Sequence, residues 1–172
     1  KTWTIISYNT SSSNSCGFTI CHQCTFSIQT SCNAYYCNVF LRLIDRDNQV
    51  DRNYKDWYES VQRFGIGQKT GIDLPGEVKG NLPTAAFYDK VNKGWRWRGA
   101  TILSLAIGQG ELGVSPIQMA NYACAIANRG HFYTPHFIRK KPANKIEKHE
   151  TGVQREYFNY LVDAMEKVIE GG

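Results

Sequence analysis

The sequence of 172 residues lacks any apolar run long enough to cross a lipid bilayer. A membrane-spanning helix needs about 20 consecutive apolar residues, and the longest run here, Ala100–Ile107, is interrupted by Thr101 and Ser104. The sequence begins with Lys1 rather than methionine, and it has no signal-peptide pattern of its own. We therefore expect any membrane anchor to lie upstream of these residues.

Long blocks of charge of one sign are also missing. The net charge of +5 comes from 20 basic and 15 acidic side chains spread along the chain, and the densest basic run is the short Arg139–Lys141. A run of this kind is more typical of a solvated face than of a nucleic-acid footprint, so we expect no nucleic-acid partner. A hydrophobic content of 42% and a charged content of 20% exclude wholesale disorder and are ordinary for a globular domain.

Cysteine is present in an uneven distribution. Five of the six cysteines lie within the first 37 residues, and Cys21-His22-Gln23-Cys24 has the spacing of a zinc knuckle or a redox pair. A zinc site of this type would need a second pair of ligands, and the sequence offers no clear one. We therefore expect no metal and no cofactor, and a disulfide of undefined pairing stays open.

Several short segments follow one another in a distinctive order. These are Ser31-Cys32-Asn33, Phe64–Gly67, Thr70–Glu77, Ile107–Gly110 and Ser115–Ala120. In this order and spacing they closely resemble the transpeptidase domain of the penicillin-binding protein 2 family of bacterial cell-wall synthases. The resemblance runs from about residue 27 to the C-terminus and does not cover the first 26 residues.

The resemblance implies an incomplete set of active-site elements. Members of the family use Ser-x-x-Lys with the nucleophilic serine, Ser-x-Asn, and Lys-Thr-Gly on a strand at the edge of a sheet. No serine here is followed three residues later by lysine, and Lys69-Thr70-Gly71 runs into a stretch rich in glycine and proline that predicts a loop. We interpret 27–172 as the central part of a transpeptidase domain without the nucleophile motif and the Lys-Thr-Gly strand, and we expect this chain alone to be inactive.

Residues 1–26 form an unmatched segment rich in serine and cysteine. Their polar run predicts a loop. Two interpretations are open: a frameshifted or otherwise corrupted stretch of the parent coding sequence, or a divergent loop.

The implied activity is acyl transfer by a peptidoglycan D,D-transpeptidase, whose partners are D-Ala-D-Ala stem peptides and β-lactam antibiotics. By resemblance, the hydroxyl of Ser31 relays a proton, and the side-chain amide of Asn33 binds the substrate carbonyl. The alternatives are an N-cap for Ser31 and a turn residue for Asn33. The implied location is the bacterial inner membrane, with the domain facing the periplasm.

Two other functional classes compete with this interpretation. A serine β-lactamase or D,D-carboxypeptidase relative would share the three motifs but would hydrolyse the acyl-enzyme with water. A non-catalytic binding fragment for nucleic acid or glycan is the third possibility. The segments Thr70–Glu77 and Ile107–Gly110 favour the synthase.

The pattern along the chain predicts an α+β fold of the penicillin-binding transpeptidase and serine β-lactamase type, in which a helical cluster lies beside an antiparallel sheet. Helices are expected over 33–45, 51–64 with Asp51 as N-cap, 115–129 and 155–170. Strands are expected over 102–107 and 131–139, and a long ordered loop over 65–99. We expect Asp73, Glu77 and Gln109 to serve the scaffold, and the histidines at 131, 136 and 149 to be surface or strand residues.

Overall fold

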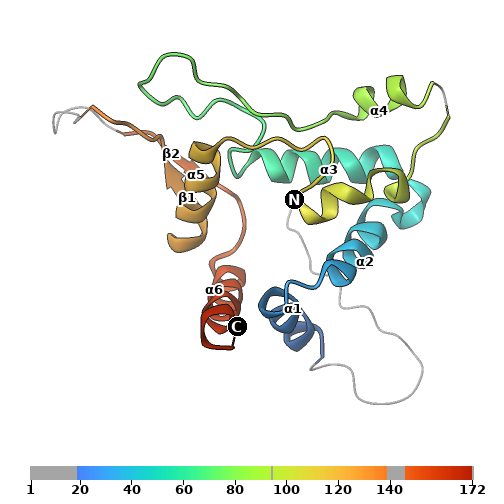
Figure 1. Ribbon diagram of the computed structural model, residues 1–172, viewed down its shortest axis with the longest axis horizontal. Helices are drawn as coiled ribbons and strands as arrows, with labels where there is room; N and C mark the ends of the chain where they lie inside the picture. Colours follow the sequence, from blue (N-terminus) through green and yellow to red (C-terminus); the bar gives the residue numbers. More distant parts are fainter. Residues whose placement is uncertain (1–18, 94, 139–145, 172) are drawn as a thin grey trace.

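The computed structural model describes residues 19–93, 95–138 and 146–171, with side chains from residue 24 onward. Its helices are α1 (Thr19–Gln29), α2 (Asn33–Ile44), α3 (Val50–Gln62), α4 (Ala85–Val91), α5 (Pro116–Ala127) and α6 (Arg155–Gly171), with 3₁₀ helices η1 (Arg46–Asn48) and η2 (Gly99–Ile107). The strands β1 (His131–Tyr133) and β2 (Lys148–Glu150) pair antiparallel, with Phe132 opposite His149 (Figure 1). Within these ranges no helix combines the length and apolar character that crossing a membrane requires.

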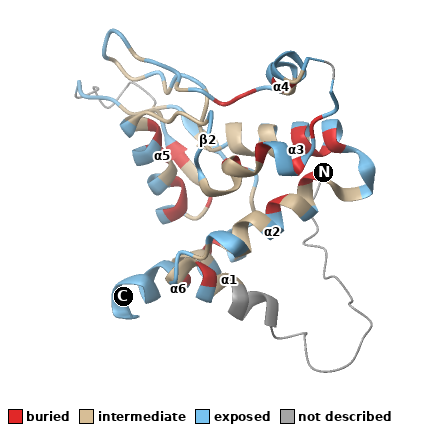
Figure 2. Cartoon of the chain, turned by 45° about the vertical axis from the view of Figure 1, so that its right-hand side comes forward, coloured by how far each residue is buried: buried red, intermediate tan, exposed pale blue. Residues whose placement is uncertain are grey.

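The main hydrophobic core lies where α2, α3 and η2 meet (Figure 2), and Tyr54 of α3 is one of its fully buried members. The Tyr54 ring lies edge-on to the rings of Trp97, at 5.2 Å, and Tyr88, at 5.9 Å, and its hydroxyl donates to the carbonyl oxygen of Pro83 at 2.7 Å. Burial raises the pKa of Tyr54 well above its ordinary value. The other buried members of this core are Phe40, Ile44, Val50, Ile102 and Leu105.

Two polar side chains fix the end of α2 against its neighbours. The buried amide of Asn53 donates to the carbonyl oxygens of Ile44, at 3.1 Å, and Arg46, at 2.7 Å. Asp45, the C-cap of α2, accepts from the backbone N–H of Gly99 at 2.9 Å, where η2 begins. These bonds satisfy polar groups that helix ends leave unpaired, and they set the path of the chain into η2.

The start of α5 follows the predicted signals. Ser115 is the N-cap, its hydroxyl accepts from the N–H of Gln118, and the Gln118 side chain accepts from the N–H of Ser115 at 2.9 Å, which completes a capping box. Pro116 occupies the first helical position, where its missing N–H costs nothing. The predicted helix is confirmed, and it ends at Ala127 with Asn128 as its C-cap.

The segment between α3 and α4 is held by three side chains, one from α5 and two of its own. Gln118, which is fully buried, donates to the carbonyl oxygens of Gln68, at 2.6 Å, and Lys79, at 2.8 Å. The carboxylate of Glu77 accepts from the N–H and hydroxyl of Thr70, and Asp73 reaches across to the backbone N–H groups of residues 137 and 138 at 2.8 and 3.0 Å. The predicted scaffold role of Asp73 and Glu77 is confirmed.

Several predicted elements are wrong in kind or extent. Residues 102–107 form the 3₁₀ helix η2 instead of a strand, because a short buried apolar run is compatible with either structure. The expected loop over 65–99 contains α4, whose N-cap Thr84 accepts from the N–H of Phe87 at 3.2 Å. In the expected loop over 1–26, residues from Thr19 onward belong to α1.

Smaller differences concern boundaries. The N-cap of α3 is Gln49, so Asp51 lies within the first helical turn, where its charge suits the helix dipole. The strand expected over 131–139 is confined to β1, and residues 139–145 lie outside the described ranges. The helices over 33–45 and 155–170 are confirmed as α2 and α6.

Candidate active site

The turn that joins α1 to α2 (Figure 1) contains Ser31, and Asn33 is the first residue of α2. The N–H of Ser31 donates to the carbonyl oxygen of Ile28 at 3.2 Å, and the N–H of Cys32 donates to that of Ser27 at 2.9 Å. This pair of bonds is a Schellman motif, which satisfies the last carbonyl groups of α1 and reverses the chain. Ser31 occupies the position of that motif that needs a left-handed backbone.

The backbone of Ser31 has φ = +52°, a conformation that residues other than glycine seldom adopt. A side chain there costs about 1 kcal/mol or more relative to a right-handed position. Helices most often place glycine at this point, so a serine here is less stable than glycine would be. Strain of this kind is a recognised mark of functional positions.

The N-cap interpretation of Ser31 is wrong. Cys32 is the N-cap of α2, and no side chain makes a capping bond there. Asn33 is the first residue of α2, so its interpretation as a turn residue is also wrong. Both side chains are exposed. The structure brings them together at one turn, and their catalytic roles stay a prediction.

Tyr36, in the first turn of α2, is half-buried. Burial raises the pKa of the Tyr36 hydroxyl, and Cys24 of α1, Tyr122 of α5 and Cys32 of the turn, which lie close to it, add to the shift. Partial burial raises the pKa of Tyr122, whose ring lies 5.7 Å from that of Phe64. Sequence analysis did not single out Tyr122. The sequence shows only that it lies one helical turn after Gln118 on α5.

Lys69-Thr70-Gly71 lies in a loop, as predicted. Gly71 has φ = +79°, and the hydroxyl of Thr70 donates to the Glu77 carboxylate at 2.6 Å. The Thr70 hydroxyl is thus used in a hydrogen bond within its own loop, and the neighbouring Lys69 is exposed. Within the described residues this segment forms no strand.

The turn at Gly108-Gln109-Gly110 is confirmed. Gly108 and Gly110 have φ of +70° and +74°, and a Cβ atom on Gly110 would collide with the hydroxyl of Ser104. The backbone N–H of Gln109 donates to the carbonyl oxygen of Ser104 at 3.0 Å. No side-chain hydrogen bond of Gln109 occurs within the described part of the chain, so the brace expected of its side chain stays a prediction.

Metal ligands do not cluster among the side chains that the structure describes: no group of three His, Cys, Asp or Glu side chains could hold an ion there. The side chains of Cys21 and His22 in the Cys-x-x-Cys segment lie outside those residues. Cys24, Cys32, Cys37 and Cys124 are free thiols.

Comparison with known proteins gives a consistent result. The family model described as the penicillin binding protein transpeptidase domain matches residues 2–172, a range that takes in the first 26 residues as well. The peptidoglycan D,D-transpeptidase MrdA of Acinetobacter baumannii is 33% identical over 114 residues, which are 66% of this chain and 15% of that protein. The chain therefore corresponds to a small part of the length of such relatives.

Solved structures of similar shape come from the same group. The structure of Pseudomonas aeruginosa PBP2 in complex with WCK 5153 superposes with a TM-score of 0.68 at 27% identity, over 86% of this chain and 32% of that one. The complex between PBP2 and MreC from Helicobacter pylori gives a TM-score of 0.66 at 27% identity, over 86% of this chain and 26% of that one. The helix-rich α+β arrangement predicted from sequence is thereby confirmed. The chain belongs to the penicillin-binding protein transpeptidase domain family.

Proposed function

We propose that this chain is part of a peptidoglycan D,D-transpeptidase that cross-links stem peptides through a serine acyl-enzyme. Membership of the family and the similarity to MrdA proteins support the activity. Within the chain, one observation carries the proposal: the Ser31–Asn33 turn presents a hydroxyl and an amide to solvent on a strained backbone.

The reaction has two steps. A serine hydroxyl in the longer protein attacks the carbonyl carbon of the penultimate D-alanine, and the terminal D-alanine leaves as an amine after it gains a proton. An amine of a neighbouring stem then attacks the ester, loses a proton, and releases the serine. Both steps require proton transfer at the nitrogen that leaves or attacks.

The side chains of this chain would serve binding and proton transfer. The Ser31 hydroxyl can accept one proton and donate another, which suits a relay between a base and the substrate nitrogen. The Asn33 amide can donate to a substrate carbonyl oxygen. Because Ser31 has no capping duty in α2, its hydroxyl is available for such a role.

The proposed partners follow from the same chemistry. D-Ala-D-Ala stem peptides are the substrates, and β-lactams acylate the same serine as substrate analogues. We further propose that a segment of the longer protein anchors it in the bacterial inner membrane, with this domain in the periplasm.

The proposal is tested with fluorescent penicillin on the longer protein. Asn33→Ala should slow acylation because a bound carbonyl loses its donor, a loss of about 1–3 kcal/mol. Asn38→Ala, five residues further along α2, is the matched control, since its exposed amide donates to the carbonyl oxygen of Ala34 in its own helix. Equal acylation by Asn33→Ala and the parent would contradict the proposed site.

The fate of the adduct separates the transpeptidase from its nearest alternative. A transpeptidase should hold the penicilloyl group for many minutes, whereas a β-lactamase would hydrolyse it and release product continuously. Steady turnover of penicillin by the longer protein would favour the β-lactamase interpretation.

A further inference from the structure

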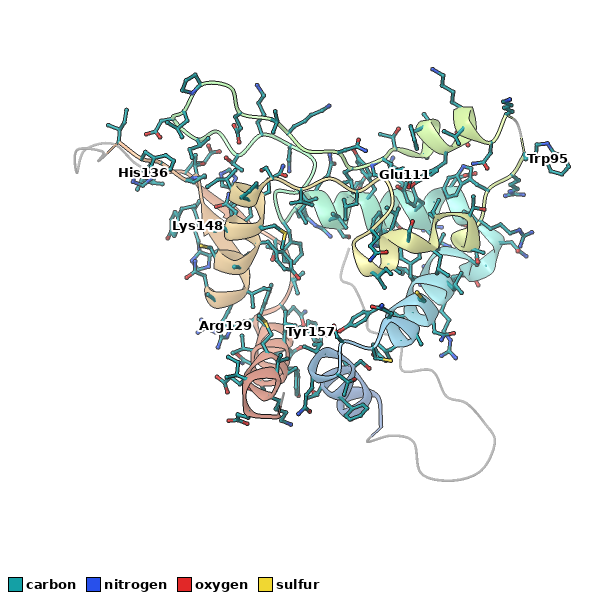
Figure 3. The ribbon with its side chains drawn as sticks, in the orientation of Figure 1. Trp95, Glu111, Arg129, His136, Lys148 and Tyr157 are labelled. Carbon is teal, nitrogen blue, oxygen red and sulfur yellow. The ribbon has the colours of Figure 1, made fainter. Side chains whose placement is uncertain are left out.

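Two tryptophans separated by one residue have opposite environments. Trp97 is 3% exposed, and its indole N–H donates to the Asp89 carboxylate at 2.8 Å. Trp95 is 83% exposed and projects from the edge of the molecule beyond α4 (Figure 3). A tryptophan offers a large apolar surface, so leaving one almost wholly in water marks a candidate contact surface.

Trp95 has apolar and cationic neighbours along the chain. Phe87 and Val91, one turn apart on α4, are 40% and 56% exposed. Lys90, Lys93 and Arg96 are exposed as well. We call these six residues the Trp95 surface: Phe87, Lys90, Val91, Lys93, Trp95 and Arg96.

This region carries an excess of positive charge. Residues 84–98 contain four cations and one carboxylate, a net charge of +3 out of +5 for the whole chain. None of these cations forms an ion pair with any residue that the structure describes. The single carboxylate, Asp89, is bound to Trp97. The surface therefore suits an anionic partner.

Two hydrogen bonds connect the backbone at Trp95 to the end of α4. The N–H of Trp95 donates to the carbonyl oxygen of Asn92 at 2.9 Å, and the Asn92 side chain donates to that of the buried Tyr88 at 2.8 Å.

We propose that the Trp95 surface binds peptidoglycan at a place separate from the Ser31–Asn33 turn. In both Figure 1 and Figure 2, α3 lies between α4 and α1. The Ser31–Asn33 turn follows the end of α1, so the two sites lie on opposite sides of α3. The inference rests on the proposed function, because that function makes peptidoglycan the substrate. Peptidoglycan is a polymer of sugar rings that carries peptides with carboxylates. The flat indole face suits the apolar face of a sugar ring, and separate cations suit carboxylates repeated along a polymer.

The test is co-sedimentation of the full 172-residue chain with purified peptidoglycan sacculi at low and high salt. We expect Trp95→Ala to weaken binding about tenfold, since exposed tryptophans that bind are usually dominant contacts. Its control is Tyr160→Ala, which removes another exposed aromatic ring, on α6. We expect the triple variant Lys90→Gln, Lys93→Gln, Arg96→Gln to weaken binding and to flatten its salt dependence.

The triple variant Arg52→Gln, Lys55→Gln, Lys167→Gln removes the same charge elsewhere and should bind like the parent. Phosphatidylglycerol vesicles and a single-stranded oligonucleotide serve as competing probes. No binding to sacculi, equal loss in both triple variants, parental binding by Trp95→Ala, or tighter binding to either competing probe would each overturn the inference. Acylation by penicillin in the longer protein tests the proposed function separately, because it reports the serine and not this surface.

Discussion

The side-chain amide of Gln118 donates to the carbonyl oxygen of Lys79 at 2.8 Å, although 39 residues separate them in the chain. The same amide binds the carbonyl oxygen of Gln68 at 2.6 Å. One fully buried glutamine at the start of α5 thus holds both ends of the segment that contains Thr70–Glu77. This explains how a stretch rich in glycine and proline is ordered without regular structure of its own.

Replacement of Gln118 by leucine should destabilise the fold. The substitution keeps the volume but leaves the carbonyl oxygens of Gln68 and Lys79 without a donor, so we expect a loss of about 3 kcal/mol in the free energy of unfolding. Denaturant titration measures it. Gln154→Leu, at an exposed position, should change stability by no more than about 0.5 kcal/mol. Equal effects of the two variants would show that the buried amide is dispensable.

Alanine substitutions at two glycines of this segment distinguish the cost of backbone strain from the cost of a steric collision. Gly76 and Gly80 have φ of +79° and +69°, so alanine is strained at both. A Cβ atom meets nothing within 4 Å at Gly76, whereas at Gly80 it would collide with the carbonyl oxygen of Gly113 and lie 2.9 Å from Gln118 Oε1. We expect Gly76→Ala to cost about 1–2 kcal/mol.

Gly80→Ala should cost about 2 kcal/mol more than Gly76→Ala, because the Asn81–Gly113 bridge must also open. Thermal and denaturant unfolding of the two variants compare the costs. Equal destabilisation would mean that the close approach of residues 80 and 113 does not occur.

The contact of Asp73 with residues 137 and 138 should depend on pH. The N–H of Phe137 and then that of Ile138 hold the pKa of the Asp73 carboxyl below its ordinary value. A depressed pKa in the folded state means that the stabilisation is complete above the unfolded pKa, about 3.9, and is lost as pH falls through the lower folded value.

Amide shifts of Phe137 and Ile138, followed by NMR, should therefore titrate with a midpoint below about 3.9. Asp73→Asn should abolish that titration and leave the amide of Thr70, which reports Glu77, unchanged. A midpoint above the ordinary value would contradict the hydrogen bonds.

The 172-residue chain alone should form no covalent adduct with penicillin. No serine has a lysine three residues later, so none has the expected base. Incubation with fluorescent penicillin and denaturing electrophoresis provide the check. A labelled band that is lost on mutation of any single serine of this chain would place the nucleophile here and overturn the motif assignment.

Local signals in the sequence were sufficient where the decisive contacts are local. Ser115, Pro116 and Gln118 lie within four residues, and together they define the start of α5. The strand predicted over 102–107 failed because the apolar run carries no period, and the core around Tyr54 and Asp45 decides in favour of η2. A seven-residue helix such as α4 is too short to show a period, although Thr84 offered a capping signal.

The position of the candidate site in the sequence could be predicted from its motif, whereas its backbone conformation could not. The Ser-x-Asn spacing located the turn between α1 and α2. The left-handed backbone of Ser31 could not be predicted, because serine has no preference for it and the Schellman motif that requires it depends on α1.

Ser31 occupies a strained turn position that glycine would fit better, and the proposed reason for a serine there is its hydroxyl. The most direct measurement is the rate of acylation by fluorescent penicillin in the longer transpeptidase carrying Ser31→Gly, beside its free energy of unfolding. Glycine suits φ = +52°, so the turn should persist and stability should hold or rise by about 0.5–1 kcal/mol. Loss of the proton relay should slow acylation about 100-fold or more. Acylation at the parental rate by this folded variant would contradict the proposed proton relay through the Ser31 hydroxyl.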